Sequence, residues 1–140
     1  CGAPNARPGL LTAFAKVGLS GDYGVSYFLP FLVGQSKARE LLFRASIVTG
    51  AEALELGLVN AVVDQDAFTA EVAAMAQELA ALPTVALGYM KRNLNAVNTT
   101  TLSQMLDREA AGMARCFTTE DHKGAVKAFV AKQAPAFQGR

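Results

Sequence analysis

Apolar residues recur at spacings of three and four along most of this chain, which is the period of an amphipathic helix. From Asp66 the pattern continues almost to the C-terminal end. Pro83 closes a first stretch, Thr101-Leu-Ser-Gln104 has the spacing of a capping box, and Thr118 or Thr119 can cap a last helix. The predicted helices cover roughly residues 66–82, 84–97, 101–117 and 119–132. We expect their apolar stripes to pack together as a core.

The first 65 residues carry a more mixed pattern. Residues 1–9 contain two prolines and two glycines and are predicted to form a loop, followed by a short strand or turn over residues 10–17. Tyr23 to Leu32 is predicted to form a helix that Pro30 kinks or shortens. A second short helix is expected from Lys37 to Phe43.

A capping signal then marks a third helix in this half of the chain. Thr49-Gly-Ala-Glu52 has the capping-box spacing, and Gly57 supplies a left-handed stop. Residues 58–63 are short and rich in valine, so we predict a strand or extended segment there.

Asp22 stands out in the glycine-rich loop from Gly18 to Gly24, directly before the apolar helix. One interpretation is structural, because an Asp at a helix start often caps the amides of the first turn. The other is chemical, because a carboxylate there can transfer a proton or act as a nucleophile at the mouth of a pocket. The local sequence leaves both open.

Composition narrows the class of protein. Hydrophobic residues make up 51% and charged residues only 18%, which predicts apolar surface that meets a partner subunit or another part of the fold. The 13 basic and 12 acidic residues give a net charge of +1, which does not favour nucleic-acid binding. Cys1 and Cys116 are typical of a reduced cytoplasmic protein, and neither a membrane span nor a signal peptide is predicted.

Common catalytic motifs are missing. The sequence contains no HExxH, CxxC, GxGxxG, GxxxxGK[ST] or GxSxG motif, so we predict no metal site and no nucleotide cofactor. His122 is the single histidine and lies in the polar cluster 120–123, where we expect a solvated surface residue rather than a catalytic base.

In their order along the chain, these segments resemble the C-terminal half of the crotonase superfamily, the enoyl-CoA hydratases and isomerases. Asn5-Ala-Arg7 resembles a family segment, with Pro8 where Phe is usual. Gly18 to Gly24 is similar to the active-site loop, and Glu52 to Val63 to the family string Glu-Ala-x-x-x-Gly-Leu-Val-x-x-Val-Val. Asp121 to Phe137 looks like the family's C-terminal helix and tail.

The resemblance implies an α/β fold, the C-terminal portion of the crotonase ββα spiral, mostly helical here with a short strand near 58–63. Residues 1–65 would belong to the spiral core, and residues 66–140 to a helical oligomerisation region of a trimer or dimer of trimers. The substrate would be an acyl-CoA thioester, with no other cofactor. Two backbone N–H groups that polarise the thioester carbonyl would belong to the half of the fold that precedes this chain.

The resemblance also implies site residues. Asp22 matches a position where some family members carry a functional Asp, which favours the chemical interpretation. Phe14 stands where the second hydratase glutamate is expected, four residues before Gly18. Tyr23, Gly24, Tyr27 and Phe14 would contact the acyl group, and Phe129 and Lys132 would contact CoA.

We therefore expect an enzyme that stabilises a thioester enolate during hydration or double-bond isomerisation. The alternative is a non-catalytic helical assembly module, or a truncated crotonase fragment with no activity alone. Phe14 and the apolar composition favour that alternative.

Overall fold

A computed structural model describes residues 9–11 and 13–140. The chain separates into two compact units, Cys1–Gln65 and Asp66–Arg140, and each is described by itself. The loop predicted for residues 1–8, with the family-like segment Asn5 to Arg7, lies outside the described residues. The roles that the resemblance assigns to the two halves of the chain stay predictions.

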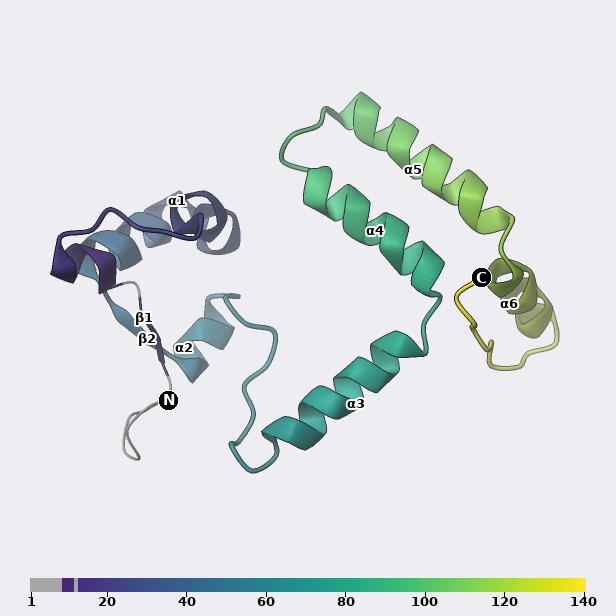
Figure 1. Cartoon of the computed structure of the whole chain (residues 1–140), viewed down its shortest axis with the longest axis horizontal. Helices are drawn as coiled ribbons and strands as arrows, with labels where there is room; N and C mark the ends of the chain where they lie inside the picture. The colour runs from purple at the N-terminus through teal and green to yellow at the C-terminus, as the bar shows by residue number, and fades with distance from the viewer. Residues whose placement is uncertain (1–8, 12) are drawn as a thin grey trace. The chain divides into compact units, whose positions relative to one another are not determined.

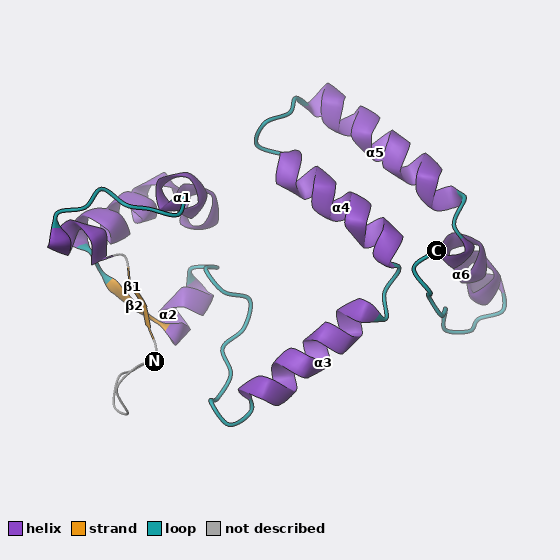
Figure 2. Ribbon diagram, viewed as in Figure 1, coloured by secondary structure: helices purple, strands orange, loops and turns teal. Residues whose placement is uncertain are grey.

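The first unit combines a two-stranded sheet with helices (Figures 1 and 2). In chain order it contains β1 (Gly9–Leu11), the 3-10 helix η1 (Ala13–Val17), α1 (Val25–Arg44), β2 (Ile47–Thr49) and α2 (Gly50–Glu55). The strands are antiparallel, with Leu10 opposite Val48. The short strand predicted within residues 10–17 is therefore confirmed in part, whereas β2 was not predicted.

Helix α1 consists of two helical segments joined at Gly34. Gly34 has φ of 77° and ψ of 160°, which is far from helical geometry, whereas the helix continues through Pro30. The two helices predicted on either side of Gly34 are confirmed, but the kink lies at the glycine rather than at the proline. Proline is tolerated when neighbouring turns adjust to the missing N–H.

The capping box of α2 is confirmed. The Thr49 hydroxyl accepts a hydrogen bond from the Glu52 N–H, and the Glu52 carboxylate accepts one from the Thr49 N–H. At the other end Gly57 is left-handed, and Leu58 N–H donates to the Ala53 carbonyl at 2.8 Å. This pattern is a Schellman motif, which satisfies the last carbonyls of the helix.

The strand predicted near residues 58–63 is wrong. The described residues contain two strands, β1 and β2, which pair with each other, and no ladder includes residues 58–63. A strand needs a partner for its backbone groups, and valine-rich composition alone does not supply one. Val62 instead approaches α2, because a Cβ on Gly50 would lie 3.3 Å from its Cγ1.

A small apolar core lies in the first unit. Its buried side chains come from α1, β2 and α2, and they are Leu29, Ala38, Leu41, Val48 and Ala53. Partly buried residues of the same elements and of the segment after α2 pack around them, among them Val25, Val33, Leu42, Leu56, Leu58 and Val59. The hydrophobic effect therefore holds these elements together.

The second unit consists of four helices (Figure 2). They are α3 (Phe68–Ala80), α4 (Thr84–Ala96), α5 (Leu102–Phe117) and α6 (Glu120–Val130), close to the predicted ranges. The capping box of Thr101 and Gln104 is confirmed, and Thr119 rather than Thr118 caps α6. Helices α4 and α5 pack against each other, and α5 contacts α6.

The prediction that the apolar stripes of these helices form a core is wrong for this chain. The buried residues within 66–140 are Gly112, Thr119 and Asp121, so no apolar side chain is buried there. Helix α3 is exposed along its whole length. The exposed stripe residues include Phe68, Val72, Met75, Leu79, Met90, Leu94, Leu106, Met113 and Phe117. A helix period identifies an apolar face but does not identify the surface that covers it.

Candidate active site

The glycine-rich loop is held at its start by the end of η1. Leu19 N–H donates to the Phe14 carbonyl at 2.9 Å, and Gly18 N–H donates to the Ala15 carbonyl at 3.3 Å. Gly18 has φ of 71°, so this turn closes like a Schellman motif. Phe14 is half-buried in η1, which contacts α1. The start of the loop is therefore fixed by η1, which itself packs against α1.

At its other end the loop enters α1 through a left-handed glycine. Gly24 is the N-cap residue with φ of 72°, and a Cβ there would lie 3.0 Å from Cε2 of Phe28. Both the positive φ and this close approach require glycine. Tyr23 also has a positive φ, of 55°, and its side chain is 91% exposed. An L-residue in this region is strained, so the surrounding turn must hold Tyr23 there.

Asp22 does not cap α1. The N-cap residue is Gly24, and no side-chain bond caps this helix end. The exposed Asp22 carboxylate accepts one hydrogen bond, from the Tyr23 N–H to Oδ1 at 2.7 Å. Among the described residues no side chain pairs with it. The structural interpretation of Asp22 as a helix cap is therefore wrong, and the chemical interpretation remains.

An aromatic surface follows Asp22 on the first turns of α1. The Tyr27 ring makes edge-to-face contacts with Phe28 at 5.1 Å and with Phe31 at 5.2 Å between ring centroids. All three rings are about half exposed. Tyr27 and Phe31 are four residues apart in α1, so they share one face of the helix. The structure thus brings Asp22, Tyr23, Gly24 and Tyr27 together in one segment of the first unit.

Sequence reasoning missed the aromatic partners of Tyr27. Phe28 and Phe31 fall within the helix predicted from Tyr23 to Leu32, and neither is among the predicted site residues. The i+4 spacing of Phe31 from Tyr27 within the predicted helix is the signal that could have identified it. Phe28 could have been found through Gly24, since a glycine at a helix start often marks a close neighbour.

Phe129 and Lys132 lie in the second unit, at the end of α6. Lys132 has φ of 54°, and its N–H donates to the Phe129 carbonyl at 3.1 Å. Gln133 N–H donates to the Ala128 carbonyl at 2.9 Å, which completes a Schellman motif with a lysine in the usual glycine position. Phe129 is 83% exposed, and Lys132 is exposed as well. Both side chains are accessible at one helix end.

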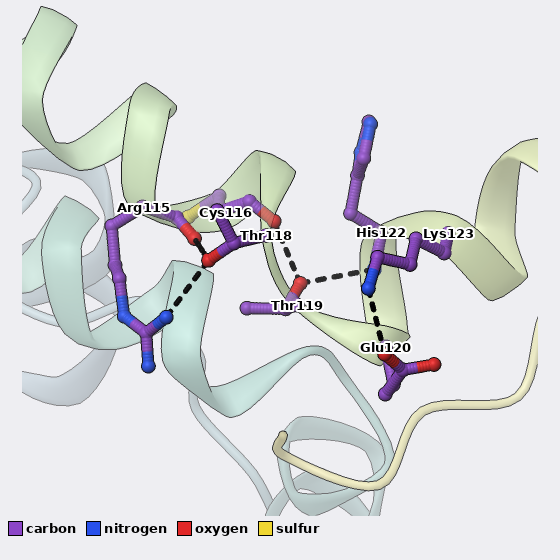
Figure 3. A network of polar contacts seen from close by, with 7 residues as sticks. All are labelled: Arg115, Cys116, Thr118, Thr119, Glu120, His122 and Lys123. Carbon is purple, nitrogen blue, oxygen red and sulfur yellow. Dashed lines mark hydrogen bonds and ion pairs between the residues drawn. The ribbon is translucent and has the colours of Figure 1, made fainter.

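The start of α6 is fixed by a tight turn from α5 (Figure 3). The buried Thr119 hydroxyl donates to the Cys116 carbonyl at 2.7 Å and accepts from the His122 N–H at 3.1 Å. The His122 ring is half-buried and packs edge-to-face on Phe117 at 4.9 Å. His122 is thus a packing residue rather than the fully solvated one expected. Within the described residues no group of three His, Cys, Asp or Glu residues could hold a metal ion.

Comparisons with known proteins identify the family. The family model for enoyl-CoA hydratase/isomerase matches residues 3–140. The chain is 33% identical over 128 residues to the 1,2-epoxyphenylacetyl-CoA isomerase of Escherichia coli K12, covering 91% of this chain and 49% of that protein. It is 33% identical over 113 residues to a short-chain-enoyl-CoA hydratase of Clostridioides difficile, covering 81% of this chain and 73% of that protein.

Comparison with solved structures indicates the same family. A crystal structure of an enoyl-CoA hydratase/isomerase from Cupriavidus metallidurans CH34 matches with a TM-score of 0.84 and 34% identity, over 91% of this chain and 48% of that one. The chain belongs to the enoyl-CoA hydratase/isomerase family and has the fold of a C-terminal portion of a crotonase. It spans about half the length of most of these relatives.

Proposed function

We propose that the protein containing this chain binds acyl-CoA thioesters and catalyses hydration or double-bond isomerisation through a thioester enolate, with Asp22 as the acid/base. The observation that carries this proposal is the exposed Asp22 carboxylate, which lies on the loop before α1 with one backbone hydrogen bond and no side-chain partner. An acid/base needs an oxygen that is free and within reach of the substrate, and Oδ2 of Asp22 has no hydrogen-bond partner among the described residues.

The geometry supports a simple division of roles. The Tyr23 N–H orients Oδ1, which leaves Oδ2 to take a proton from a carbon of the acyl chain and return it to another. The rings of Tyr23 and Tyr27 can contact the acyl group and exclude water around that proton transfer. Gly24 would let the acyl chain pass close to the backbone.

Phe14 favours a mechanism with one carboxylate rather than two on this side of the site. Its half-buried ring has no proton to give or take, so it would serve as an apolar wall. Isomerisation needs one group that takes and returns the same proton, whereas hydration by two carboxylates needs a second one.

We propose that Phe129 and Lys132 contact the CoA part of the substrate. The exposed ammonium group of Lys132 can pair with a phosphate, and the exposed Phe129 ring can contact an apolar or stacked group. Their place at one Schellman turn fixes both backbones. No cofactor beyond the CoA thioester is required for this chemistry.

The experiment is Asp22→Asn in the full-length protein, assayed with a short enoyl-CoA. We expect turnover to fall by roughly 100- to 10,000-fold, the range that a positioned acid/base contributes, with nearly unchanged CoA-ester binding. Asp64→Asn is the matched control, because Asp64 is an exposed loop carboxylate outside the site. Unchanged turnover in Asp22→Asn would refute the assignment.

A second candidate function is assembly, because the apolar stripes of α3 to α6 are exposed. A pocket of about 480 Å³ between α4 and α5 adds to this surface, with Tyr89, Met90, Leu94 and Met113 in its lining. We propose that these faces join copies of the protein as a trimer or a dimer of trimers. Sedimentation equilibrium tests this state, and a monomer at all concentrations would contradict it. If this chain serves assembly alone, titration with an acyl-CoA should show no binding.

No helix in the described ranges is long and apolar enough to cross a membrane. We propose a cytoplasmic location on the cysteine usage of the sequence, since two distant cysteines do not form a disulfide framework.

A further inference from the structure

Asp121 is a buried carboxylate that bonds to the C-terminal tail. Its side chain is in the second position of α6, and the residue is only 4% exposed. Oδ1 accepts a hydrogen bond from the Gln138 N–H at 2.6 Å, and Oδ2 accepts one from the Gly139 N–H at 2.9 Å. Both carboxylate oxygens are therefore occupied by backbone donors 17 and 18 residues away.

The contact is reciprocal. The Asp121 N–H, which has no partner inside its own helix, donates to the Arg140 carbonyl at 3.0 Å. A carboxylate at a helix N-terminus is also favoured by the helix dipole, and hydrogen bonds to an ionised acceptor are stronger than neutral ones. Three bonds thus join the first turn of α6 to residues 138–140.

A second contact holds the tail at Gly139. Its φ is 74°, and a Cβ at this position would lie 2.6 Å from Oγ1 of Thr84, the first residue of α4. A side chain there would therefore meet both an unfavourable backbone region and a close neighbour. Only glycine lets the tail pass against the start of α4.

The path of the tail follows from these contacts. Helix α6 has 11 residues and is roughly 16 Å long at 1.5 Å per residue. The chain turns at Lys132 and returns along this length to the start of the same helix, as Figure 1 shows. Residues 131–137 are held at one end by the Schellman turn and at the other by Asp121.

We propose that Asp121 and residues 138–140 form a strap that positions the 131–137 segment, and with it Lys132. Asp121 is a positioning residue in this proposal and does not touch the substrate. The strap itself rests on the geometry above. Only its effect on CoA contacts rests on the proposed function, since that effect requires Lys132 to bind CoA.

The direct test is amide hydrogen exchange of Gln138 and Gly139 in the full-length protein. Asp121→Asn keeps the shape of the side chain but replaces one carboxylate oxygen with an NH₂ group. That group would face a backbone N–H of Gln138 or Gly139, and two donors cannot form a hydrogen bond. We expect the exchange of at least one of these amides to accelerate by about tenfold or more, since local opening sets its rate. Asp107→Asn is the matched control, because it makes the same change at an exposed carboxylate of α5.

Gly139→Ala tests the same strap without altering a helix. We expect the same acceleration, with part of it restored by Thr84→Ala, which removes the Oγ1 contact but not the backbone strain. Gly124→Ala is its control, since a Cβ at this helical glycine would meet nothing within 4 Å. Unchanged exchange at residues 138 and 139 in both Asp121→Asn and Gly139→Ala would overturn the strap.

Kinetics separate the strap from the proposed function. If both hold, Asp121→Asn should raise KM for an acyl-CoA roughly fivefold with kcat nearly unchanged, the pattern of lost uniform binding. Accelerated exchange with an unchanged KM would keep the strap and refute its link to CoA. An inactive wild-type protein with accelerated exchange in the variants would refute the proposed function alone.

Discussion

The two units use the same helix caps but are stabilised in different ways. Residues 1–65 bury a small apolar core around Leu41, formed by elements that follow one another in the chain. Residues 66–140 bury no large apolar side chain, and their most buried side chains are polar, those of Thr119 and Asp121. The first unit therefore has an apolar core, whereas the buried side chains of the second unit are polar ones at the start of α6.

The difference teaches that an apolar pattern and an apolar core are separate properties. Leu79 belongs to a regular stripe and is 52% exposed, whereas Leu41 is 5% exposed in a helix whose pattern is interrupted by Gly34. Contacts from outside the second unit would be needed to cover its stripes. This reasoning supports the proposed assembly, in which the cover comes from other copies.

The largest expected effect is on the core of the first unit. Leu41→Ala should lower the free energy of unfolding by about 2–4 kcal/mol, because it removes buried methyl groups and leaves a cavity. Chemical denaturation monitored by circular dichroism measures the change. Leu79→Ala on α3 is the matched control, expected to cost less than about 1 kcal/mol if its surface stays exposed. Equal losses in both variants would contradict the comparison and show that the α3 stripe is covered.

An intermediate effect is expected at the turn between α5 and α6. Thr119→Ala should lower the free energy of unfolding by about 1 kcal/mol, because it removes the cap of the His122 N–H and a bond to the Cys116 carbonyl. Thr119→Ser keeps the hydroxyl and should restore most of the loss. If serine were no better than alanine, packing of the threonine methyl group rather than capping would stabilise this turn.

The smallest expected effect is on pH dependence. Hydrogen bonds from the Thr49 backbone and side chain lower the pKa of Glu52 below its ordinary value of 4.5, and the bond and charge of Lys123 lower the pKa of Glu120 in the same direction. A lowered folded-state pKa adds stability that is present above the unfolded pKa and is lost as pH falls through the folded value. Helicity should therefore decline on acidification below about pH 4.5.

Added salt should change the contributions of Glu52 and Glu120 to the acid transition differently. The exposed Glu120–Lys123 ion pair is screened by added salt, whereas Glu52 is held by uncharged donors. We expect Glu52→Gln to flatten the acid transition at both low and high salt, and Glu120→Gln to flatten it at low salt alone. An identical response of the two variants at 1 M salt, roughly a 3 Å screening length, would contradict this difference.

Local signals in the sequence predicted the helix ends well. The caps at Thr49, Thr101 and Thr119 and the stop at Gly57 depend on residues three or four positions apart, so the pattern of side chains suffices to locate them. The Asp22 loop could be located in the same way. The role of the Asp22 carboxylate could not be predicted, because the same local sequence fits both a helix cap and a carboxylate that caps nothing.

Contacts between residues that are far apart in the sequence were not predicted. β2 pairs with β1 across the whole length of α1, and the valines of residues 58–63 found no strand partner. Asp121 was recognised only as part of a family-like segment, although it bonds to the tail 17 residues away. No periodic pattern links such positions, because their contact depends on how the intervening chain turns.

The sequence by itself determined where helices begin and end and to which family this chain belongs, because capping bonds are short-range and family motifs are read residue by residue. Only the tertiary structure decided which apolar faces are buried, that the Asp22 carboxylate is not a cap, and that Asp121 holds the tail. These properties require groups distant in the chain to meet or to fail to meet. Burial and hydrogen bonding respond to that proximity and not to the order of residues.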